Sequence, residues 1–239
     1  MTLFNQALSY DDVLVVPQYS DIESRSEVSL VSELDTNNKF ELPIIASPMD
    51  TVVEAEMALA LAEIGALGVI HRYNSIRDQK EMTWSVANAM PNKPVAAAIA
   101  ITGDFMERAE ALCNSGVTIL CVDVAHGHHI MMKDALMRLR RDLPDNVHIM
   151  AGNVATRKGY EDLADWGAHS VRIGIGGGSI CSTRVQTGHG VPTFQSVLDC
   201  SESEYAGTIP IIADGGIKNS GDIVESLGAG ADFVMIGSV

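Results

Sequence analysis

The sequence lacks several features that mark other classes of protein. Basic residues are few, with 16 Lys and Arg against 31 Asp and Glu, which gives a formal net charge of −15. No block of Lys or Arg stands out, so a surface for nucleic acid or for an anionic membrane is not expected. The chain also has no run of about 18 apolar residues and no signal-peptide pattern, so no transmembrane helix is predicted.

Cysteines and aromatic residues are also scarce. The four cysteines, Cys113, Cys121, Cys181 and Cys200, show neither close pairing nor metal-type spacing. This usage is typical of a reduced, cytoplasmic protein. Aromatic residues make up 5% of the chain, so the core must be built from aliphatic side chains. Three histidines lie between residues 126 and 129, but without a second group of ligands they predict no metal site.

Short apolar runs recur along the chain, and nearly all of them are followed by a helix-like segment. Eight runs are found, at residues 42–46, 67–70, 95–101, 118–124, 147–154, 170–175, 209–213 and 233–237. They are continuous rather than alternating, which indicates strands buried on both faces. Strands that alternate with helices imply a parallel sheet. Eight such units predict an α/β fold, a (β/α)8 TIM barrel, with a doubly wound open sheet as the alternative.

The chain has no low-complexity linker, which favours one domain preceded by a short extension. Residues 1–40 carry turn residues and alternating patterns, so they are interpreted as an N-terminal extension that includes a hairpin over the barrel floor. Residues 41–239 are interpreted as the barrel and catalytic domain.

The most informative stretch is residues 174–192, a glycine-dense loop with Cys181 near its middle. Glycines expose backbone N–H groups and allow left-handed turns, so such a loop can surround an ion. A cysteine among these N–H groups lies in positive potential, which favours the thiolate. The loop therefore suggests covalent attack on a phosphorylated small molecule. The alternative is a glycine-rich turn with an incidental cysteine.

In a barrel of this kind, functional groups gather where strands end and loops begin. The predicted strand ends carry polar or glycine residues, and these would converge on one face. They are Ser47 with Met49 and Asp50, His71 with Arg72, Asp123, Asn153, Asp214 with Gly215 and Gly216, and Gly237 with Ser238. A simple β-turn is the competing interpretation of Asp214 and its two glycines.

Six motifs together resemble the IMP dehydrogenase/GMP reductase family over nearly the whole chain. They are Asp11-Asp12-Val13-Leu14 with Pro17, Ser47-Pro48-Met49-Asp50-Thr51-Val52, Asp123-Val124-Ala125-His126-Gly127, Ala151-Gly152-Asn153-Val154, Gly178-Ser179-Ile180-Cys181-Ser182-Thr183-Arg184, and Ala213-Asp214-Gly215-Gly216-Ile217. Their order and number make chance agreement untenable.

The resemblance implies a role for each matching position. Cys181 would be the nucleophile that attacks C2 of a purine nucleotide, and Thr183 would help to activate the leaving group or water. Substrate contacts are implied for Ser47, Met49, Ser179, Asp214, Gly216, Gly237 and Ser238, with Asp214 on the ribose. Asp123 and Asn153 would line the nicotinamide region. The carbonyls of Gly176, Gly178 and Cys181 would hold a monovalent cation, K⁺.

The resemblance also implies two opposite reactions, and the motifs favour one. The segment between His71 and Pro94 leaves no room for the tandem regulatory insert of most dehydrogenases, and residues 24–28 and 183–188 are reductase-like. The chain is therefore interpreted as a GMP reductase that uses NADPH. The alternatives are an IMP dehydrogenase that uses NAD, and a nucleotide-binding module without catalysis. A barrel with Schiff-base chemistry is disfavoured because no lysine stands at a predicted strand end. A homotetramer is expected by family analogy.

The sequence departs from the family pattern at two places. His71-Arg72 stands where a His-Lys pair is common, and arginine lacks the compact ammonium that proton transfer would use. Family members also continue beyond the eighth strand with a helix and a mobile flap, whereas this sequence ends at Val239. The expectation is a barrel truncated after strand eight that binds nucleotide but turns over weakly.

Overall fold

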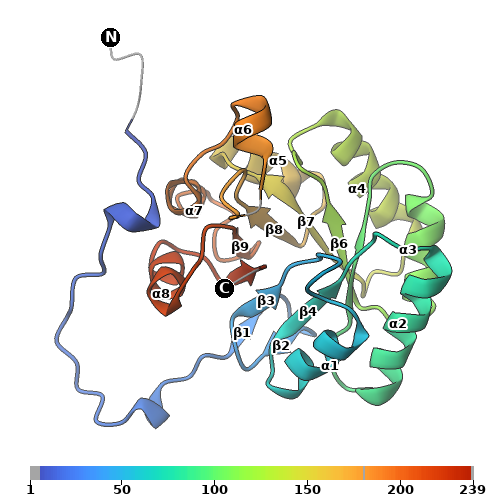
Figure 1. The fold of residues 1–239 in the computed structure, drawn as a ribbon, viewed down its shortest axis with the longest axis horizontal. Coiled ribbons are helices and arrows are strands. Elements are labelled where there is room, and N and C mark those ends of the chain that lie inside the picture. Colours follow the sequence, from blue (N-terminus) through green and yellow to red (C-terminus); the bar gives the residue numbers. More distant parts are fainter. Residues whose placement is uncertain (1–5, 180, 238–239) are drawn as a thin grey trace.

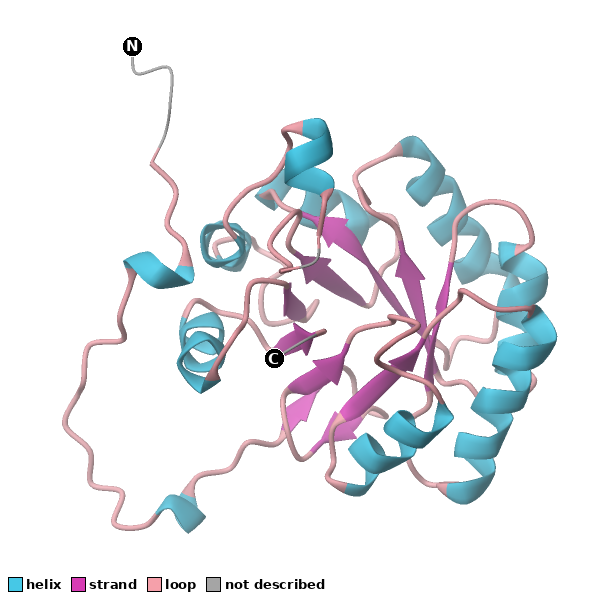
Figure 2. Cartoon of the chain, viewed as in Figure 1, coloured by secondary structure: helices cyan, strands magenta, loops and turns pink. Residues whose placement is uncertain are grey.

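Eight parallel strands close into a barrel in the computed structural model of the chain, which describes residues 6–179 and 181–237 (Figures 1 and 2). The strands are β3 (Ile44–Ala46), β4 (Leu67–Ile70), β5 (Ala96–Ile99), β6 (Ile119–Asp123), β7 (His148–Val154), β8 (Ser170–Ile173), β9 (Ile211–Asp214) and β10 (Phe233–Ile236). The barrel closes where β10 pairs with β3, with Val234 opposite Ile44. The predicted (β/α)8 fold is confirmed, and the open sheet is excluded.

Helices follow the strands and surround the barrel (Figure 1). They are α1 (Ala55–Glu63), α2 (Ile76–Ala89), α3 (Phe105–Cys113), α4 (Ile130–Asp142), α5 (Arg157–Asp165), α6 (Thr183–Thr187), α7 (Thr193–Ser201) and α8 (Ser220–Gly228). Several begin at side-chain caps; Thr156 Oγ1, for example, accepts the N–H of Gly159 at 3.1 Å before α5. None of the helices in the described ranges combines the length and the apolar character needed to cross a bilayer.

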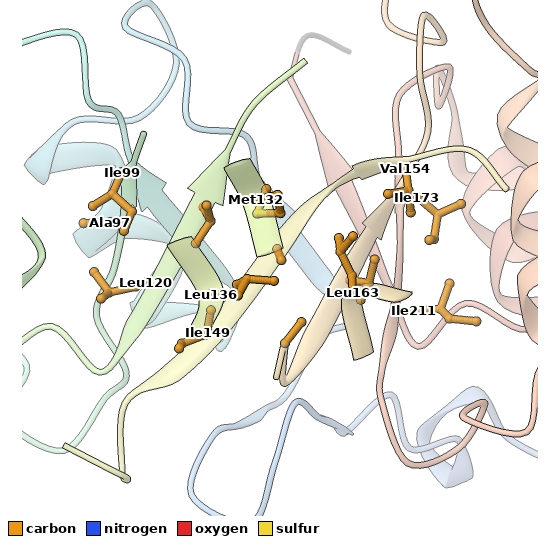
Figure 3. Packing of buried hydrophobic residues seen from close by; sticks show 14 of the residues in the cluster. Ala97, Ile99, Leu120, Met132, Leu136, Ile149, Val154, Leu163, Ile173 and Ile211 are labelled. Carbon is orange, nitrogen blue, oxygen red and sulfur yellow. The ribbon is translucent and has the colours of Figure 1, made fainter. Parts of the chain in front are cut away.

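The aliphatic side chains form two layers, one inside the barrel and one between the strands and the helices. The outer layer packs strand residues such as Leu120 and Ile149 against Leu136 of α4 and Leu163 of α5 (Figure 3). The inner layer contains side chains from alternate strand positions, from small ones such as Ala98 to large ones such as Phe233. Strands buried on both faces account for the continuous apolar runs in the sequence.

A two-stranded antiparallel hairpin, β1 (Ser32–Glu33) and β2 (Lys39–Phe40), covers the floor of the barrel, as the sequence predicted. Leu34 and Phe40 join the inner apolar layer. The Phe40 ring meets Phe233 of β10 edge to face, with 5.7 Å between the ring centroids. The barrel is therefore a packed core, closed at the N-terminal ends of its strands.

The same hairpin is tied to the barrel by a buried polar chain. His148 Nδ1 lies 2.6 Å from Asp35 Oδ2, and His148 Nε2 lies 2.8 Å from Ser170 Oγ. The His169 ring lies 5.3 Å from the His148 ring, and its Nδ1 accepts the N–H of Ile149 at 2.8 Å. Burial, followed by the charges of His148 and Arg140, lowers the pKa of His169 to about 4.

His169 makes stability dependent on pH in a defined window. An unfolded histidine titrates near pH 6.5, so between pH 6.5 and about 4 the unfolded chain takes up a proton that folded His169 refuses. We expect the free energy of unfolding to fall by about 2 kcal/mol across this window. This is less than the full pKa shift would give, because the His169 side chain is partly exposed and solvent screens its charge. In His169→Asn, an amide oxygen can accept from Ile149 without titrating, so this part of the loss should vanish. Urea unfolding at pH 7 and pH 4.5 measures it, and identical pH dependence of the two proteins would contradict the assignment.

The segment before the hairpin lies outside the barrel, with two short 3-10 helices, η1 (Tyr10–Asp12) and η2 (Arg25–Glu27) (Figure 1). Tyr10 anchors η1: its hydroxyl meets Ser226 Oγ of α8 at 2.8 Å, and its ring meets Phe194 of α7 edge to face. The following residues run as an extended arm whose apolar side chains, Leu14 and Tyr19 among them, are exposed.

Candidate active site

A cleft of about 1150 Å³ opens at the C-terminal ends of the strands. It collects nearly all the site residues predicted from the sequence. Those that line it are Ser47, Met49, Asp123, Asn153, Gly176, Gly178, Ser179, Cys181, Asp214, Gly216 and Gly237. Thr183 does not line the cleft but touches Cys181, and Ser238 lies outside the described residues. The convergence expected for a barrel is therefore found.

Two glycine turns, after β8 and after β9, meet backbone to backbone at the cleft. A Cβ on Gly174 would lie 2.0 Å from the Asp214 carbonyl oxygen, and one on Gly215 would lie 2.8 Å from the Gly178 nitrogen. Gly215 and Gly216 have φ of 96° and 85°, in the region that side chains disfavour. Only glycine permits this approach, and it brings Cys181 and Asp214 into one cleft.

Cys181 has the chemical setting of a nucleophile. Its Sγ lies 3.3 Å from Thr183 Oγ1. Hydrogen bonding from the Thr183 side chain and backbone lowers the pKa of the Cys181 thiol, with smaller contributions from the Gly176 backbone and the Arg184 charge. Burial raises the pKa of Cys113 to about 11 and of Cys121 and Cys200 to about 12. Of the four cysteines, Cys181 alone is shifted towards the thiolate, which is the reactive form.

The short helix α6 follows Cys181 directly, and the sequence did not predict it. The prediction treated the whole stretch before α7 as loop. With five residues, α6 is too short to show helical periodicity, and it ends at Gly188 with a φ of 71°. It places Thr183 beside the thiol and turns Arg184 back towards the glycines.

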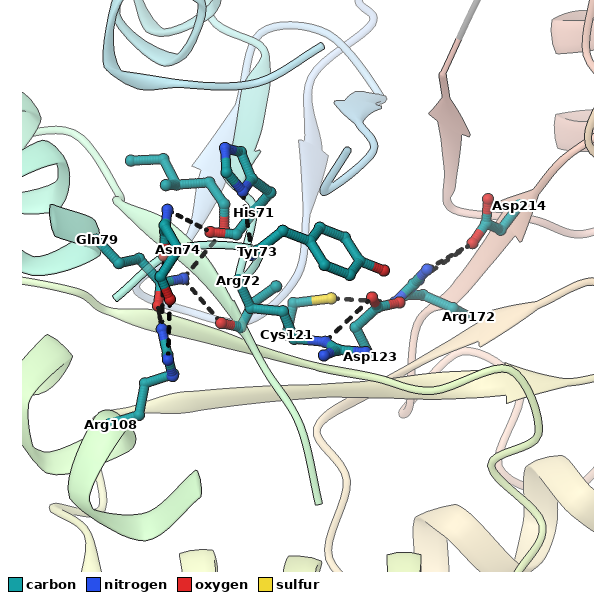
Figure 4. A network of polar contacts seen from close by, with 12 residues as sticks. His71, Arg72, Tyr73, Asn74, Gln79, Arg108, Cys121, Asp123, Arg172 and Asp214 are labelled. Carbon is teal, nitrogen blue, oxygen red and sulfur yellow. Dashed lines mark hydrogen bonds and ion pairs between the residues drawn. The ribbon is translucent and has the colours of Figure 1, made fainter. Parts of the chain in front are cut away.

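A buried arginine on β8 joins two of the predicted carboxylates (Figure 4). Arg172 is 5% exposed, and its Nη1 donates to Asp123 Oδ1 at 2.8 Å. Its Nη2 and Nε donate to Asp214 Oδ2 at 2.9 and 3.1 Å. The guanidinium therefore holds the ends of β6 and β9 together and neutralises charge that this acidic chain would otherwise concentrate in the cleft.

Asn153 and Arg72 complete this polar end of the barrel, and each has one buried polar atom without a hydrogen-bond partner among the described residues. Asn153 Nδ2 donates to the Gly174 carbonyl and to Asp214 Oδ2, both at 2.8 Å. Its Oδ1 is buried and accepts no hydrogen bond from any described residue. Arg72 Nε forms an ion pair with Asp123 Oδ2 at 3.7 Å, but it is likewise buried and donates no hydrogen bond to those residues. A buried polar atom without a hydrogen-bond partner is costly, so both atoms are available to a ligand.

Another wall of the cleft comes from the loop after β3. Met49 and Ser47 lie close to Gly237. A Cβ placed on Gly237 would be 2.9 Å from Met49 Sδ and 3.8 Å from Ser47 Oγ. The N–H of Ser47 donates to the Ile236 carbonyl at 2.9 Å. Ser47, Met49 and Gly237 thus form one surface across the seam of the barrel.

The histidines after β6 take part in contacts with their neighbours. His128 pairs with Asp162 at 2.7 Å, and no group of three or more potential ligands occurs within the described ranges. All four cysteines are free thiols.

Sequence reasoning missed Arg172, the arginine inside a doubly buried strand. A signal was present, since a lone arginine in the apolar run 170–175 needs buried carboxylates as partners. Asp123 and Asp214 were already assigned to the ends of two other strands. It also missed the wall formed by Ser9, Tyr10 and Asp11, because nothing local shows that η1 docks on α7 and α8.

Comparison with known proteins agrees with this geometry. A family model described as "IMP dehydrogenase / GMP reductase domain" matches residues 7–239. The inosine-5'-monophosphate dehydrogenase of Nitrosopumilus maritimus is 31% identical over 99% of this chain and 75% of its own length. That of Cryptosporidium parvum is 34% identical, covering 98% of this chain and 68% of its own length.

Relatives named for the second activity are equally similar. The GMP reductase of Vibrio parahaemolyticus is 35% identical over 97% of this chain and 68% of its own length. Relatives of both activities thus match nearly the whole chain, and each of the six sequence motifs contributes residues to the lining of the cleft. The chain belongs to the IMP dehydrogenase/GMP reductase family of oxidoreductases.

Proposed function

We propose that this protein is a purine-nucleotide oxidoreductase in which Cys181 attacks C2 of a bound nucleotide, and that its reaction is the reduction of GMP to IMP. One observation carries the proposal. The single cysteine whose pKa is lowered lies in the same cleft as the glycine turns and Asp214. A thiolate there can form a bond to an electrophilic ring carbon of a ligand held by these groups.

The nucleotide is held by groups along the cleft. Asp214 Oδ2 is occupied by Arg172 and Asn153, which leaves Oδ1 to accept from ribose hydroxyls. The phosphate is assigned to Ser179, Gly216, Gly237 and Ser238, near the last two strands, where barrels of this class commonly bind phosphate. Ser47 and Met49 form the wall against which the base packs.

The chemistry of the reductase balances with this set of groups. The Cys181 thiolate forms a C–S bond at C2 of GMP, and the 2-amino group leaves as ammonia. Thr183 Oγ1, beside the sulfur, is placed to help the leaving group depart. After hydride has been added to C2, the C–S bond breaks and the thiolate is restored. In sum, GMP, NADPH and two protons give IMP, NADP⁺ and ammonium.

The family uses a nicotinamide cofactor, which when bound supplies or accepts the hydride. The residues at the polar end of the cleft fit this group. The unpaired Asn153 Oδ1 can accept from a carboxamide N–H₂, and Asp123, fixed by Arg172, lies on the adjoining strand. These two residues would orient the nicotinamide, and NADPH is the form that the reductase requires.

Three further assignments belong to the same proposal. A monovalent cation, K⁺, would be bound by the carbonyls of Gly176, Gly178 and Cys181. Carbonyl oxygens suit such an ion, and the Gly178 oxygen, which accepts from Cys181 N at 3.1 Å, retains a lone pair. Residues 41–239 would form the catalytic domain after an extension of residues 1–40. The assembly would be a homotetramer.

Alignment lengths favour the reductase over the dehydrogenase. The alignment with the Nitrosopumilus maritimus dehydrogenase extends over 358 residues although this chain has 239, so that relative carries a long insertion. The alignment with the Vibrio parahaemolyticus reductase extends over 237 residues.

Parallel assays of the two reactions test the proposal. The full chain is given GMP with NADPH, or IMP with NAD, and both nicotinamide absorbance and ammonia are followed. We expect one ammonia released for each NADPH oxidised in the first mixture, even if only a single turnover occurs. Reduction of NAD in the second mixture, without ammonia, would overturn the reductase in favour of the dehydrogenase.

Calorimetry supplies the control for a protein that binds without reacting. GMP and IMP should both release or absorb heat on binding, and inosine, which lacks the phosphate, should bind much more weakly. Nucleotide binding with no absorbance change in either mixture would contradict an oxidoreductase and support a binding module.

A further inference from the structure

The N-terminus of α7 lies at the cleft, beside the glycine turn that leaves β8. Pro192 and Thr193, where this helix begins, are part of the cleft lining. A Cβ on Gly177 would lie 2.3 Å from Thr193 Oγ1, and one on Gly174 would lie 3.3 Å from it. The hydroxyl therefore packs directly against the backbone of the turn, in space that glycine leaves free.

The Thr193 hydroxyl is buried and has no hydrogen-bond partner in the described part of the chain. The residue is 4% exposed, and its Oγ1 bonds to no described residue. A buried hydroxyl that stays unpaired costs free energy. Valine has almost the same shape and would fill this position without that cost, so packing alone does not account for the oxygen.

The helix offers further unused donors at the same place. Pro192 gives α7 no side-chain cap, and no acidic residue stands in the first turn. The N–H of Gln195 donates to the Leu8 carbonyl at 3.2 Å. The N–H groups of Thr193 and Phe194 donate to no described residue. A helix N-terminus with free N–H groups favours a negative charge, so this turn of α7 is suited to an anionic group of a ligand.

This turn of α7 adjoins the residues assigned to the nucleotide phosphate. The Cβ position of Gly177, which meets Thr193, also lies 3.2 Å from the Gly215 carbonyl oxygen. A Cβ on Gly216 would lie 3.3 Å from the Gly177 carbonyl oxygen. Thr193, Gly177 and Gly216 are thus successive neighbours along the cleft. Because the chain carries a formal net charge of −15, a phosphate bound here needs local positive potential, which a helix N-terminus supplies.

We infer that Thr193 is a further substrate-binding residue, and that its hydroxyl and the N-terminus of α7 bind the 5'-phosphate of the nucleotide. The inference rests on the proposed function in so far as a purine nucleotide occupies the cleft. The hydroxyl donates to a phosphate oxygen, and the helix dipole stabilises the negative charge. The bound phosphate thereby provides the partner that the Thr193 hydroxyl lacks within the described residues.

Thr193→Val tests this role because it removes the hydroxyl and keeps the shape of the side chain. In calorimetry on the full chain, we expect Thr193→Val to bind IMP about tenfold more weakly than the wild type, because a hydrogen bond to a charged oxygen is lost. Inosine, which has no phosphate, should bind equally to both proteins, as measured by its displacement of IMP. Thr193→Ser retains the hydroxyl and should bind IMP within about threefold of the wild type.

Melting temperatures distinguish a binding role of the hydroxyl from a structural one. Because Thr193 Oγ1 has no partner among the described residues, Thr193→Val should melt at the wild-type temperature or above it. Ser196→Ala is the matched control on the same helix. Ser196 is also buried, but its Oγ donates to the Ala155 carbonyl at 3.1 Å. This control should melt at a lower temperature and bind IMP like the wild type.

Three results would overturn the inference. The first is an IMP affinity of Thr193→Val equal to that of the wild type. The second is an equal loss of affinity for IMP and inosine, which would trace the effect to the shape of the cleft. The third is a melting temperature of Thr193→Val lowered as in Ser196→Ala, which would make the hydroxyl structural. Failure of the proposed function would look different, as a wild-type chain that binds neither IMP nor GMP.

Discussion

Cys181→Ser is expected to lose covalent capture of a 6-chloropurine ribonucleotide completely. In the wild type the thiolate displaces chloride from the ring, so the intact mass should rise by that of the nucleotide less HCl. Serine is nearly isosteric and can keep the contact with Thr183, but its hydroxyl does not ionise near neutral pH, so no bond should form. Intact-mass spectrometry after incubation measures the adduct directly.

Binding and chemistry are separated by two further measurements. Calorimetry should show that Cys181→Ser still binds IMP within about tenfold of the wild type, because the glycine turns and Asp214 are unchanged. Cys113→Ser is the matched control: its thiol has a pKa raised to about 11 by burial and should not react. This control should capture the nucleotide like the wild type. An adduct that persists in Cys181→Ser would identify another nucleophile and end the assignment.

The sequence predicts the barrel well because its signals are local and repeated. Each strand is buried on both faces and so appears as an unbroken apolar run, and eight such runs with helices between them allow few architectures. The placement of Cys181 and Asp214 then follows from topology, since strand ends of a parallel barrel share one face. Polar residues at those ends could be assigned to one cleft before any geometry was known.

What the sequence does not predict depends on contacts between distant residues. Arg172 is a single letter in an apolar run, and its meaning comes from carboxylates 49 and 42 residues away along the chain. The Arg184 stem packs against Gly176 and Gly190, which become neighbours only when the loop closes. Tyr10 reaches Ser226 across 216 residues. None of these pairs has a periodicity or a spacing that a linear pattern could reveal.

Arg172→Met should give the largest loss of stability of any single substitution in the cleft. Removing the guanidinium leaves Asp123 and Asp214 facing one another at the end of the barrel without their shared cation. Breaking a buried ion pair from one side typically costs about 3–5 kcal/mol, which exceeds the cost of losing the side-chain packing alone. Urea unfolding should show this loss, and IMP affinity should fall at least tenfold because Asp214 is no longer held in place.

The matched control is Arg108→Met, since Arg108 is also buried, at 8% exposure, but its closest partner is the neutral Gln79 at 2.8 Å. Arg108→Met leaves no buried carboxylate unpaired, so its free energy of unfolding should fall distinctly less than that of Arg172→Met. Adding Asp123→Asn and Asp214→Asn to Arg172→Met should recover part of the lost stability, because the two carboxylates that shared the guanidinium then carry no charge, but should not recover IMP binding, which needs the Asp214 carboxylate. If Arg172→Met is as stable as the wild type, or if the triple variant binds IMP normally, charge compensation by Arg172 does not organise this cleft.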